Sequence, residues 1–182
     1  MGKYDVMDVG NENGQNIYGG VNQEHGYCPA HHNPYTKCYI FKWDTPTLIH
    51  PYHRTYLLSS STKNKGHIYR INTNTPDEYY LLEYRTKEGF DSDIPNGGLL
   101  IYHAHADLET CIERHDSINN LQPMKFYLLN ADPSSINGGL YGVDNSLRAY
   151  PGDNHDKTMF TSTTTPSAKA WDGRDFGVDI CF

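Results

Sequence analysis

"EYYLLEYRTKEGFDSDIPNGGLLIYHAHAD", residues 78–107, is the stretch that decides the fold. Its first run alternates, so that Tyr80, Leu82 and Tyr84 point to one side and the residues between them point to the other. The second run, from residue 99 onward, alternates in the same way. Glycine, aspartate, proline and asparagine fill residues 86–98, which is turn chemistry. The pattern predicts two adjacent antiparallel strands, with Tyr80, Leu82, Leu100 and Tyr102 on the better buried face.

One helix is expected upstream of this hairpin, over about residues 34–43. Asn33 is a good N-cap, and Pro34 suits the first helical position. Tyr35, Cys38, Tyr39 and Trp43 recur at helical spacing, and the Asp-Thr-Pro sequence at 44–46 ends the pattern.

The remaining regular segments resemble strands. Residues 54–61 and 67–73 are separated by a hairpin-like "TKNKG", and further strands are expected within 124–132 and 176–182. No internal repeat is found. The fold class is therefore α+β, mainly antiparallel β with one short helix and long loops. We expect a single unit over 1–182, divided into 1–32, a helix within 33–44 and a β-rich part from 54 to 182.

Composition excludes some classes of function. The chain has 182 residues and a net charge of −7, which disfavours nucleic-acid binding, because that needs clustered basic residues. No stretch approaches the ~20 apolar residues of a membrane span. Aromatic residues reach 13%, with 15 tyrosines among them.

Cysteine use and the N-terminal sequence bear on the compartment. Cys28, Cys38, Cys111 and Cys181 include no C-x-x-C pair, so a thiolate metal site is not expected. Disulfides would be possible in an oxidising compartment, and three pairings are open. The N-terminal residues lack the features of a signal peptide, so the protein is either cytosolic or has its true N-terminus elsewhere.

The sequence contains none of the common catalytic signatures. H-E-x-x-H, G-x-S-x-G, the phosphate-binding G-x-x-x-x-G-K and a dinucleotide-binding G-x-G-x-x-G are all missing from it. No residue of this chain is therefore expected to be catalytic.

The sharpest metal candidate is His103-x-His105-x-Asp107. Alternate residues of a strand share a face, so two imidazoles and a carboxylate would converge on a zinc ion. The competing interpretation is three residues on the solvent side of a strand.

Other charged residues offer weaker candidates. Glu78 and Glu83 lie near Arg85, where a cross-strand ion pair is favoured over catalysis. Asp91 and Asp93 would suit calcium through oxygen ligands, although a solvated loop is favoured. The loop histidines His25, His31 and His32 lack fixed ligand spacing and are expected to be surface residues.

Four segments together resemble one family. "YDVMD" at 4–8, "KWDTPT" at 42–47, the stretch at 78–103, and "YPG", "FT" and "TPSAKAW" within 150–171 occur in this order. They are similar to the part of the immune inhibitor A (M6) metallopeptidases that follows the zinc-binding helix. The central segment is the most specific, because it combines strand, turn and strand. This chain departs from the family pattern at Tyr4, Lys42, Tyr84, Tyr102 and His105.

This resemblance implies a role for the first residues. Asp5, Met7 and Asp8 would form the methionine turn that packs beneath the zinc of a zincin-type domain, with Met7 as a soft support and not a ligand. The zinc ligands and the general base would lie in the H-E-x-x-H helix, which this chain lacks. The resemblance implies a secreted, extracellular or periplasmic zinc endopeptidase that acts on polypeptides, of which this chain is an inactive C-terminal part.

The alternative hypothesis is a non-enzymatic β-rich module that binds protein or glycan through a tyrosine-rich surface. The two hypotheses differ in what they expect of the N-terminal part. If the metallopeptidase resemblance holds, residues 1–32 should pack least well and Met7 should be more exposed than a core methionine, because its partner element is missing.

Overall fold

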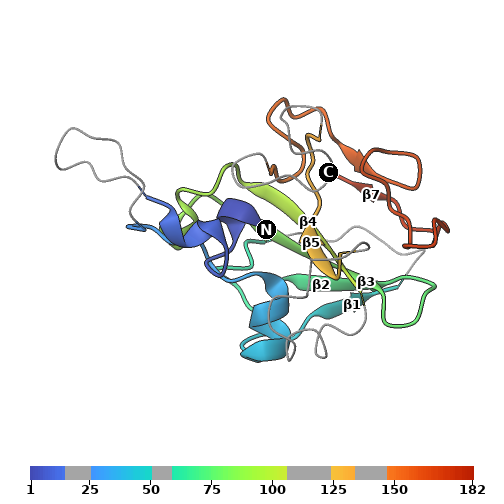
Figure 1. Cartoon of the computed structure of the whole chain (residues 1–182), viewed down its shortest axis with the longest axis horizontal. Coiled ribbons are helices and arrows are strands. Elements are labelled where there is room, and N and C mark those ends of the chain that lie inside the picture. Colours follow the sequence, from blue (N-terminus) through green and yellow to red (C-terminus); the bar gives the residue numbers. More distant parts are fainter. Residues whose placement is uncertain (15–25, 51–58, 106–123, 134–146) are drawn as a thin grey trace.

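The computed structural model describes residues 1–14, 26–50, 59–105, 124–133 and 147–182 (Figure 1). A five-stranded sheet forms its centre, in the order β1-β2-β3-β4-β5, and a two-stranded sheet of β6 and β7 lies beside it. The strands are β1 Thr47–Ile49, β2 Ile68–Asn72, β3 Tyr79–Arg85, β4 Gly98–Ala104, β5 Phe126–Leu128, β6 Met159–Phe160 and β7 Ile180–Cys181.

The central hairpin predicted from residues 78–103 is confirmed. β3 and β4 are antiparallel neighbours, with Tyr80 opposite His103 and Leu82 opposite Ile101. The prediction that Tyr80, Leu82, Leu100 and Tyr102 share one better buried face is wrong. Residues that are opposite each other share a face, so Tyr80 and Leu82 lie on the opposite face from Leu100 and Tyr102, and all four side chains are buried.

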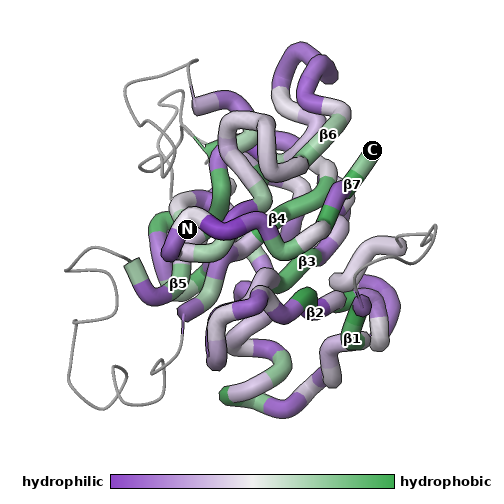
Figure 2. Tube along the Cα trace, turned by 90° about the vertical axis from the view of Figure 1, so that its right-hand side faces the viewer, coloured by the Kyte–Doolittle hydropathy of each residue, from purple (hydrophilic) through white to green (hydrophobic). Residues whose placement is uncertain are grey.

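Both faces of the sheet are covered, each by a different end of the chain. Tyr4, Ala30 and Tyr35 pack with Leu100 and Tyr102 on one face. Residues of the C-terminal part, such as Phe160 and Phe176, pack with Ile101 on the other. The near-continuous apolar sequence of both strands fits this double burial, and Figure 2 shows the hydrophobic colouring gathered along β3 and β4.

The remaining strand predictions are corrected in part. β2 pairs with β3 in antiparallel orientation, and on its other edge it pairs with β1 in parallel orientation. The hairpin expected between 54–61 and 67–73 falls partly on residues 51–58, outside the described residues. Its described end does not pair with β2, because Ser60 forms a bridge to Tyr84 of β3.

The expected helix is present but shorter. Asn33 caps it, since its Oδ1 accepts the N–H of Thr36 at 2.9 Å. The main element is η3, the π-helical turn Thr36–Ile40, and the other helical elements are single 3-10 turns: η1 Gly2–Tyr4, η2 Val9–Glu12 and η4 Gly89–Asp91. Trp43 lies beyond the helix and is exposed to solvent.

Gly98 allows the C-terminal part of the chain to join the central sheet. Its φ is 147°, and a Cβ atom there would lie 2.0 Å from the carbonyl oxygen of Tyr150. The neighbouring Leu99 and Tyr150 exchange two backbone hydrogen bonds, of 3.0 and 2.9 Å. Only glycine permits this close approach of the two backbones.

Candidate functional site

Met7 lies on a tight turn between η1 and η2. The carbonyl oxygen of Asp5 accepts the N–H of Asp8 at 3.0 Å and that of Gly10 at 3.1 Å, which closes the turn. A Cβ atom at Gly10 would lie 2.5 Å from the same oxygen, so the turn requires glycine there. Met7 itself is 71% exposed. A large apolar side chain is therefore held away from the core by a closely packed backbone.

The two aspartates of the sequence motif fix this turn. The buried carboxylate of Asp5 accepts the N–H of Met7 at 3.2 Å and the side-chain amide of Asn33 at 2.7 Å. The carboxylate of Asp8 accepts the N–H groups of Gly2 and Val9 at 2.8 and 2.9 Å. The three residues predicted as a methionine turn are thus brought together, and the aspartates have defined structural roles.

The expectation that residues 1–32 pack least well falls partly on 15–25, outside the described residues. In the described part Met7 is exposed, as expected, but its neighbours are closely packed. Tyr4 and Asp5 have no exposed surface. The Tyr4 hydroxyl accepts the N–H groups of Asn96 and Ala149, both at 3.2 Å. Burial raises the pKa of Tyr4 to about 12, so the phenol stays neutral. Long-range contacts of this kind, which a local reading of a polar segment does not reveal, hold the segment in place.

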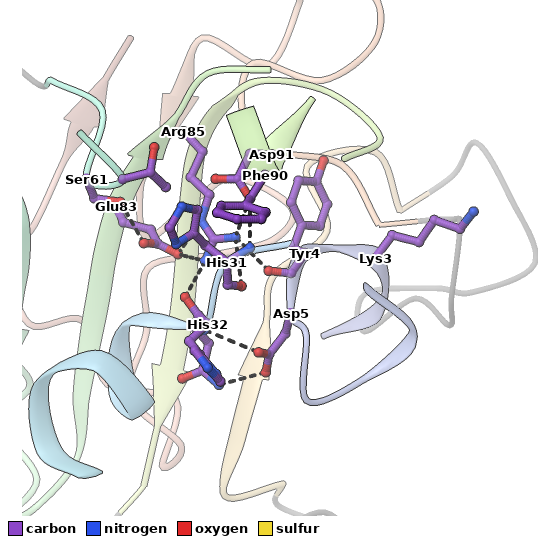
Figure 3. Close-up of polar contacts among 12 residues, drawn as sticks. Lys3, Tyr4, Asp5, His31, His32, Ser61, Glu83, Arg85, Phe90 and Asp91 are labelled. Carbon is purple, nitrogen blue, oxygen red and sulfur yellow. Dashed lines mark hydrogen bonds and ion pairs between the residues drawn. The ribbon is translucent and has the colours of Figure 1, made fainter. Parts of the chain in front are cut away.

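Arg85, at the end of β3, points toward the segment that carries the turn (Figure 3). Its guanidinium donates to the carbonyl oxygen of Tyr4 at 2.7 Å and to that of His32 at 2.8 Å. One buried cation therefore joins the segment carrying Met7 to the segment that precedes the helix. Neither of these two backbone contacts could be predicted from the sequence pattern.

Glu83 neutralises this cation and a second one. It accepts the Arg85 Nε–H at 2.8 Å and the Lys37 ammonium at 2.9 Å, and all three side chains are buried. Burial opposes ionisation, but the two cations outweigh it and lower the pKa of Glu83 to about 2. The predicted cross-strand ion pair is therefore corrected, since Glu83 and Arg85 lie two residues apart on one strand and are fully enclosed.

The two calcium candidates have different environments. Asp91 is completely buried, where it accepts the N–H of His31 at 3.0 Å and lies 3.4 Å from a nitrogen of Arg85. Asp93 is exposed. The nearby cation of Arg85 already balances the charge of Asp91. The calcium site predicted at Asp91 and Asp93 stays a prediction.

The zinc candidates are brought together only in part. Both ring nitrogens of His103 are engaged, Nε2 with Glu78 and Nδ1 with the Tyr127 hydroxyl, each at 2.7 Å. His105 is half-buried, with Nδ1 3.3 Å from Nζ of Lys125, and Asp107 lies outside the described residues. Across the described part of the chain, no group of three His, Cys, Asp or Glu side chains is placed to hold a metal ion.

The Glu78–His103–Tyr127 chain is a site that the sequence did not indicate. Burial lowers the pKa of His103 although Glu78 opposes this, so the imidazole is neutral. Burial would raise the pKa of Glu78, but hydrogen bonds from His103 and from the Trp171 N–H lower it. The carboxylate therefore accepts from Nε2–H, and Nδ1 accepts from Tyr127. Alternation within one strand does not reveal it, because the register that places His103 opposite Tyr127 is set by the tertiary structure.

The described residues include three of the four cysteines and most of the tyrosines. Cys28, Cys38 and Cys181 are free thiols, and Cys111 lies outside the described residues. The tyrosine-rich surface of the alternative hypothesis is not found in the described ranges, where most tyrosines belong to the core. The buried ones are Tyr4, Tyr35, Tyr69, Tyr79, Tyr80, Tyr102, Tyr127 and Tyr150.

Comparison of the chain with protein-family models, curated proteins and solved structures gives no match. Among the helices of the described ranges, none has the length and apolar character needed to cross a membrane.

Proposed function

We propose that this chain is the part of a secreted, M6-like zinc endopeptidase that follows the zinc-binding helix, and that it presents Met7 beneath that missing element. The observation that carries the proposal is the difference in burial between Asp5 and Met7 on the same turn. Asp5 is buried and hydrogen-bonded on several sides, whereas Met7, two residues later, is 71% exposed. A soft apolar side chain on a rigid support is suited to packing under another structural element.

The Arg85 network explains how such a support is kept rigid. Arg85 ties the carbonyl oxygens of Tyr4 and His32 together, and Glu83 keeps the cation neutralised in the interior. Burying these charges has a large desolvation cost, which is offset only when the geometry is kept. The position of the Met7 turn is therefore coupled to the central strand β3.

The proposal assigns zinc and the general base to residues outside this chain, because the sequence lacks H-E-x-x-H and the described residues contain no metal-binding group. This chain would contribute the methionine turn and one side of the cleft for a polypeptide substrate. Calcium at the 91–93 turn is a further part of the proposal. The purified chain should show no chelator-sensitive cleavage of casein, and zinc-dependent activity that co-purifies with it at constant specific activity contradicts this.

Translation of the DNA upstream of Met1 is the first test of the proposal. An in-frame H-E-x-x-H segment is expected, and a stop codon without such a segment overturns the proposal.

Methionine oxidation then tests the packing itself. Hydrogen peroxide transfers one oxygen atom to an accessible thioether, and mass spectrometry locates the sulfoxide. Met7 should react rapidly in the 182-residue chain and at least tenfold more slowly in the longer protein that includes the upstream segment. Met159, which is 48% exposed on β6, is the matched internal control and should react equally in both. Equal rates at Met7 in the two proteins would show that nothing packs on it.

A further inference from the structure

A second exposed apolar feature lies at the C-terminal end of the helix η3. Phe41 and Trp43 are 42% and 54% exposed, and their rings stack with centroids 4.5 Å apart at 30°. His32 meets both rings edge-on, at 4.9 and 5.6 Å. We call these three residues the aromatic platform. In Figure 1, η3 and the turn after it (light blue) lie at the lower edge of the molecule, away from β7 of the two-stranded sheet.

Hydrogen bonds fix the backbone of the segment that carries Phe41 and Trp43. The N–H of Phe41 donates to the Thr36 carbonyl at 2.9 Å, and that of Trp43 donates to the Lys37 carbonyl at 2.8 Å. Between them Lys42 has a φ of 55°, a left-handed conformation that a lysine adopts only at a cost of about 1 kcal/mol or more. This strained residue lies between two large rings that stack on each other and remain about half exposed to solvent.

Packing of the buried core does not explain why these two rings are held together at the surface, because neither ring belongs to that core. Exposed aromatic rings on a fixed backbone are well suited to bind a ligand, because little conformational entropy is lost when the ligand stacks on them. Strained residues likewise concentrate at ligand sites.

We propose that the aromatic platform binds a neutral glycan through the flat C–H face of a pyranose ring. An aromatic plane covers that face, while the ring hydroxyls seek fixed polar groups at its rim. Asp44 supplies such a group. Its carboxylate is held by the N–H of Thr45 at 2.7 Å and that of Gly66 at 3.0 Å, and the residue is half-exposed beside Trp43.

The charge of the protein narrows the class of ligand. A net charge of −7 repels nucleic acids, acidic glycans and anionic membrane surfaces. Of the aromatic platform's immediate sequence neighbours, Lys42 is the cation and Asp44 the anion, so the local charge is balanced. A neutral saccharide fits this balance, because it offers hydroxyl groups to both side chains and carries no charge of its own.

Titration calorimetry with neutral oligosaccharides tests the proposal, using β-1,3- and β-1,4-linked gluco-oligosaccharides and N-acetylglucosamine oligomers as probes. At least one should bind, and Trp43→Ala should weaken that binding at least tenfold, whereas Trp43→Phe should keep most of it. Leu48→Ala is the matched control, because Leu48 is an exposed apolar residue of β1 outside the aromatic platform, and it should leave the affinity unchanged. Far-UV circular dichroism confirms that each variant is folded.

Three outcomes overturn the proposal. The first is a folded protein that binds none of the neutral probes. The second is binding that survives Trp43→Ala. The third is Trp43-dependent binding to phospholipid vesicles or to a proline-rich peptide in place of the sugars, which assigns the aromatic platform to a lipid or a protein partner. None of these results bears on the oxidation of Met7, so this inference and the metallopeptidase proposal can fail separately.

Discussion

Replacing Glu83 with glutamine removes the negative charge that two buried cations share. The amide is nearly isosteric, but its NH2 group replaces one of the two oxygens that accept from Arg85 and Lys37. One cation therefore loses its acceptor, and both lose the negative charge beside them. Breaking a buried ion pair by removing one member costs about 3–5 kcal/mol. Since a domain of this kind has a free energy of unfolding of about 5–15 kcal/mol, this single substitution should remove a large part of it.

The pKa of Glu83 gives an independent value for the same interaction. A carboxyl whose pKa falls from 4.5 in the unfolded chain to about 2 in the folded protein adds about 3 kcal/mol at neutral pH. This contribution is present in full above pH 4.5 and is lost as the pH falls from there toward 2. The wild-type protein should therefore lose stability over that acidic window, and Glu83→Gln should lose less over the same window.

Urea unfolding at pH 7 and pH 3, followed by tryptophan fluorescence and circular dichroism, measures both effects. Glu88→Gln is the control, because Glu88 forms an exposed ion pair with Lys63 and should cost less than about 1 kcal/mol. Tyr102→Phe removes one 3.1 Å hydrogen bond to Glu83 and should cost about 1–3 kcal/mol, which keeps the test open if Glu83→Gln does not fold. A folded Glu83→Gln protein within 1 kcal/mol of wild type would refute the reasoning.

Three further predictions follow from backbone geometry, burial and protonation. Gly98→Ala should lower the free energy of unfolding by at least about 3 kcal/mol, because its Cβ would meet a backbone carbonyl oxygen at 2.0 Å. Gly66→Ala, with a φ of 78° and open space around it, should lower it by about 1 kcal/mol. Similar urea midpoints for the two variants would contradict this. Leu100→Ala should cost about 2–5 kcal/mol and Met7→Ala less than about 0.5 kcal/mol, as judged by thermal and urea unfolding, since one side chain is fully buried and the other exposed. NMR titration of His103 should give a pKa below 6.5 in the folded protein. Its neutral form then adds stability above pH 6.5, and this stability is lost as the pH falls through the pKa of the folded state. A raised pKa would disprove the assigned proton positions.

Local pattern was enough to predict the centre of the fold. The alternation in 79–85 and 98–104 has the period of a strand, and the glycine-rich turn between them leaves only an antiparallel hairpin. The cap at Asn33 also follows from short-range chemistry, because it depends on atoms within a few residues.

Only the tertiary structure decided which sides of these elements face each other. Alternation assigns Tyr80 and Leu100 to faces of their own strands, but the register between the strands, set across the turn, determines whether those faces coincide. The same holds for Arg85, whose partners Tyr4 and His32 are 81 and 53 residues away. A sequence period reports the direction of a side chain relative to its own backbone, whereas burial and ion pairing depend on which distant segment packs against it.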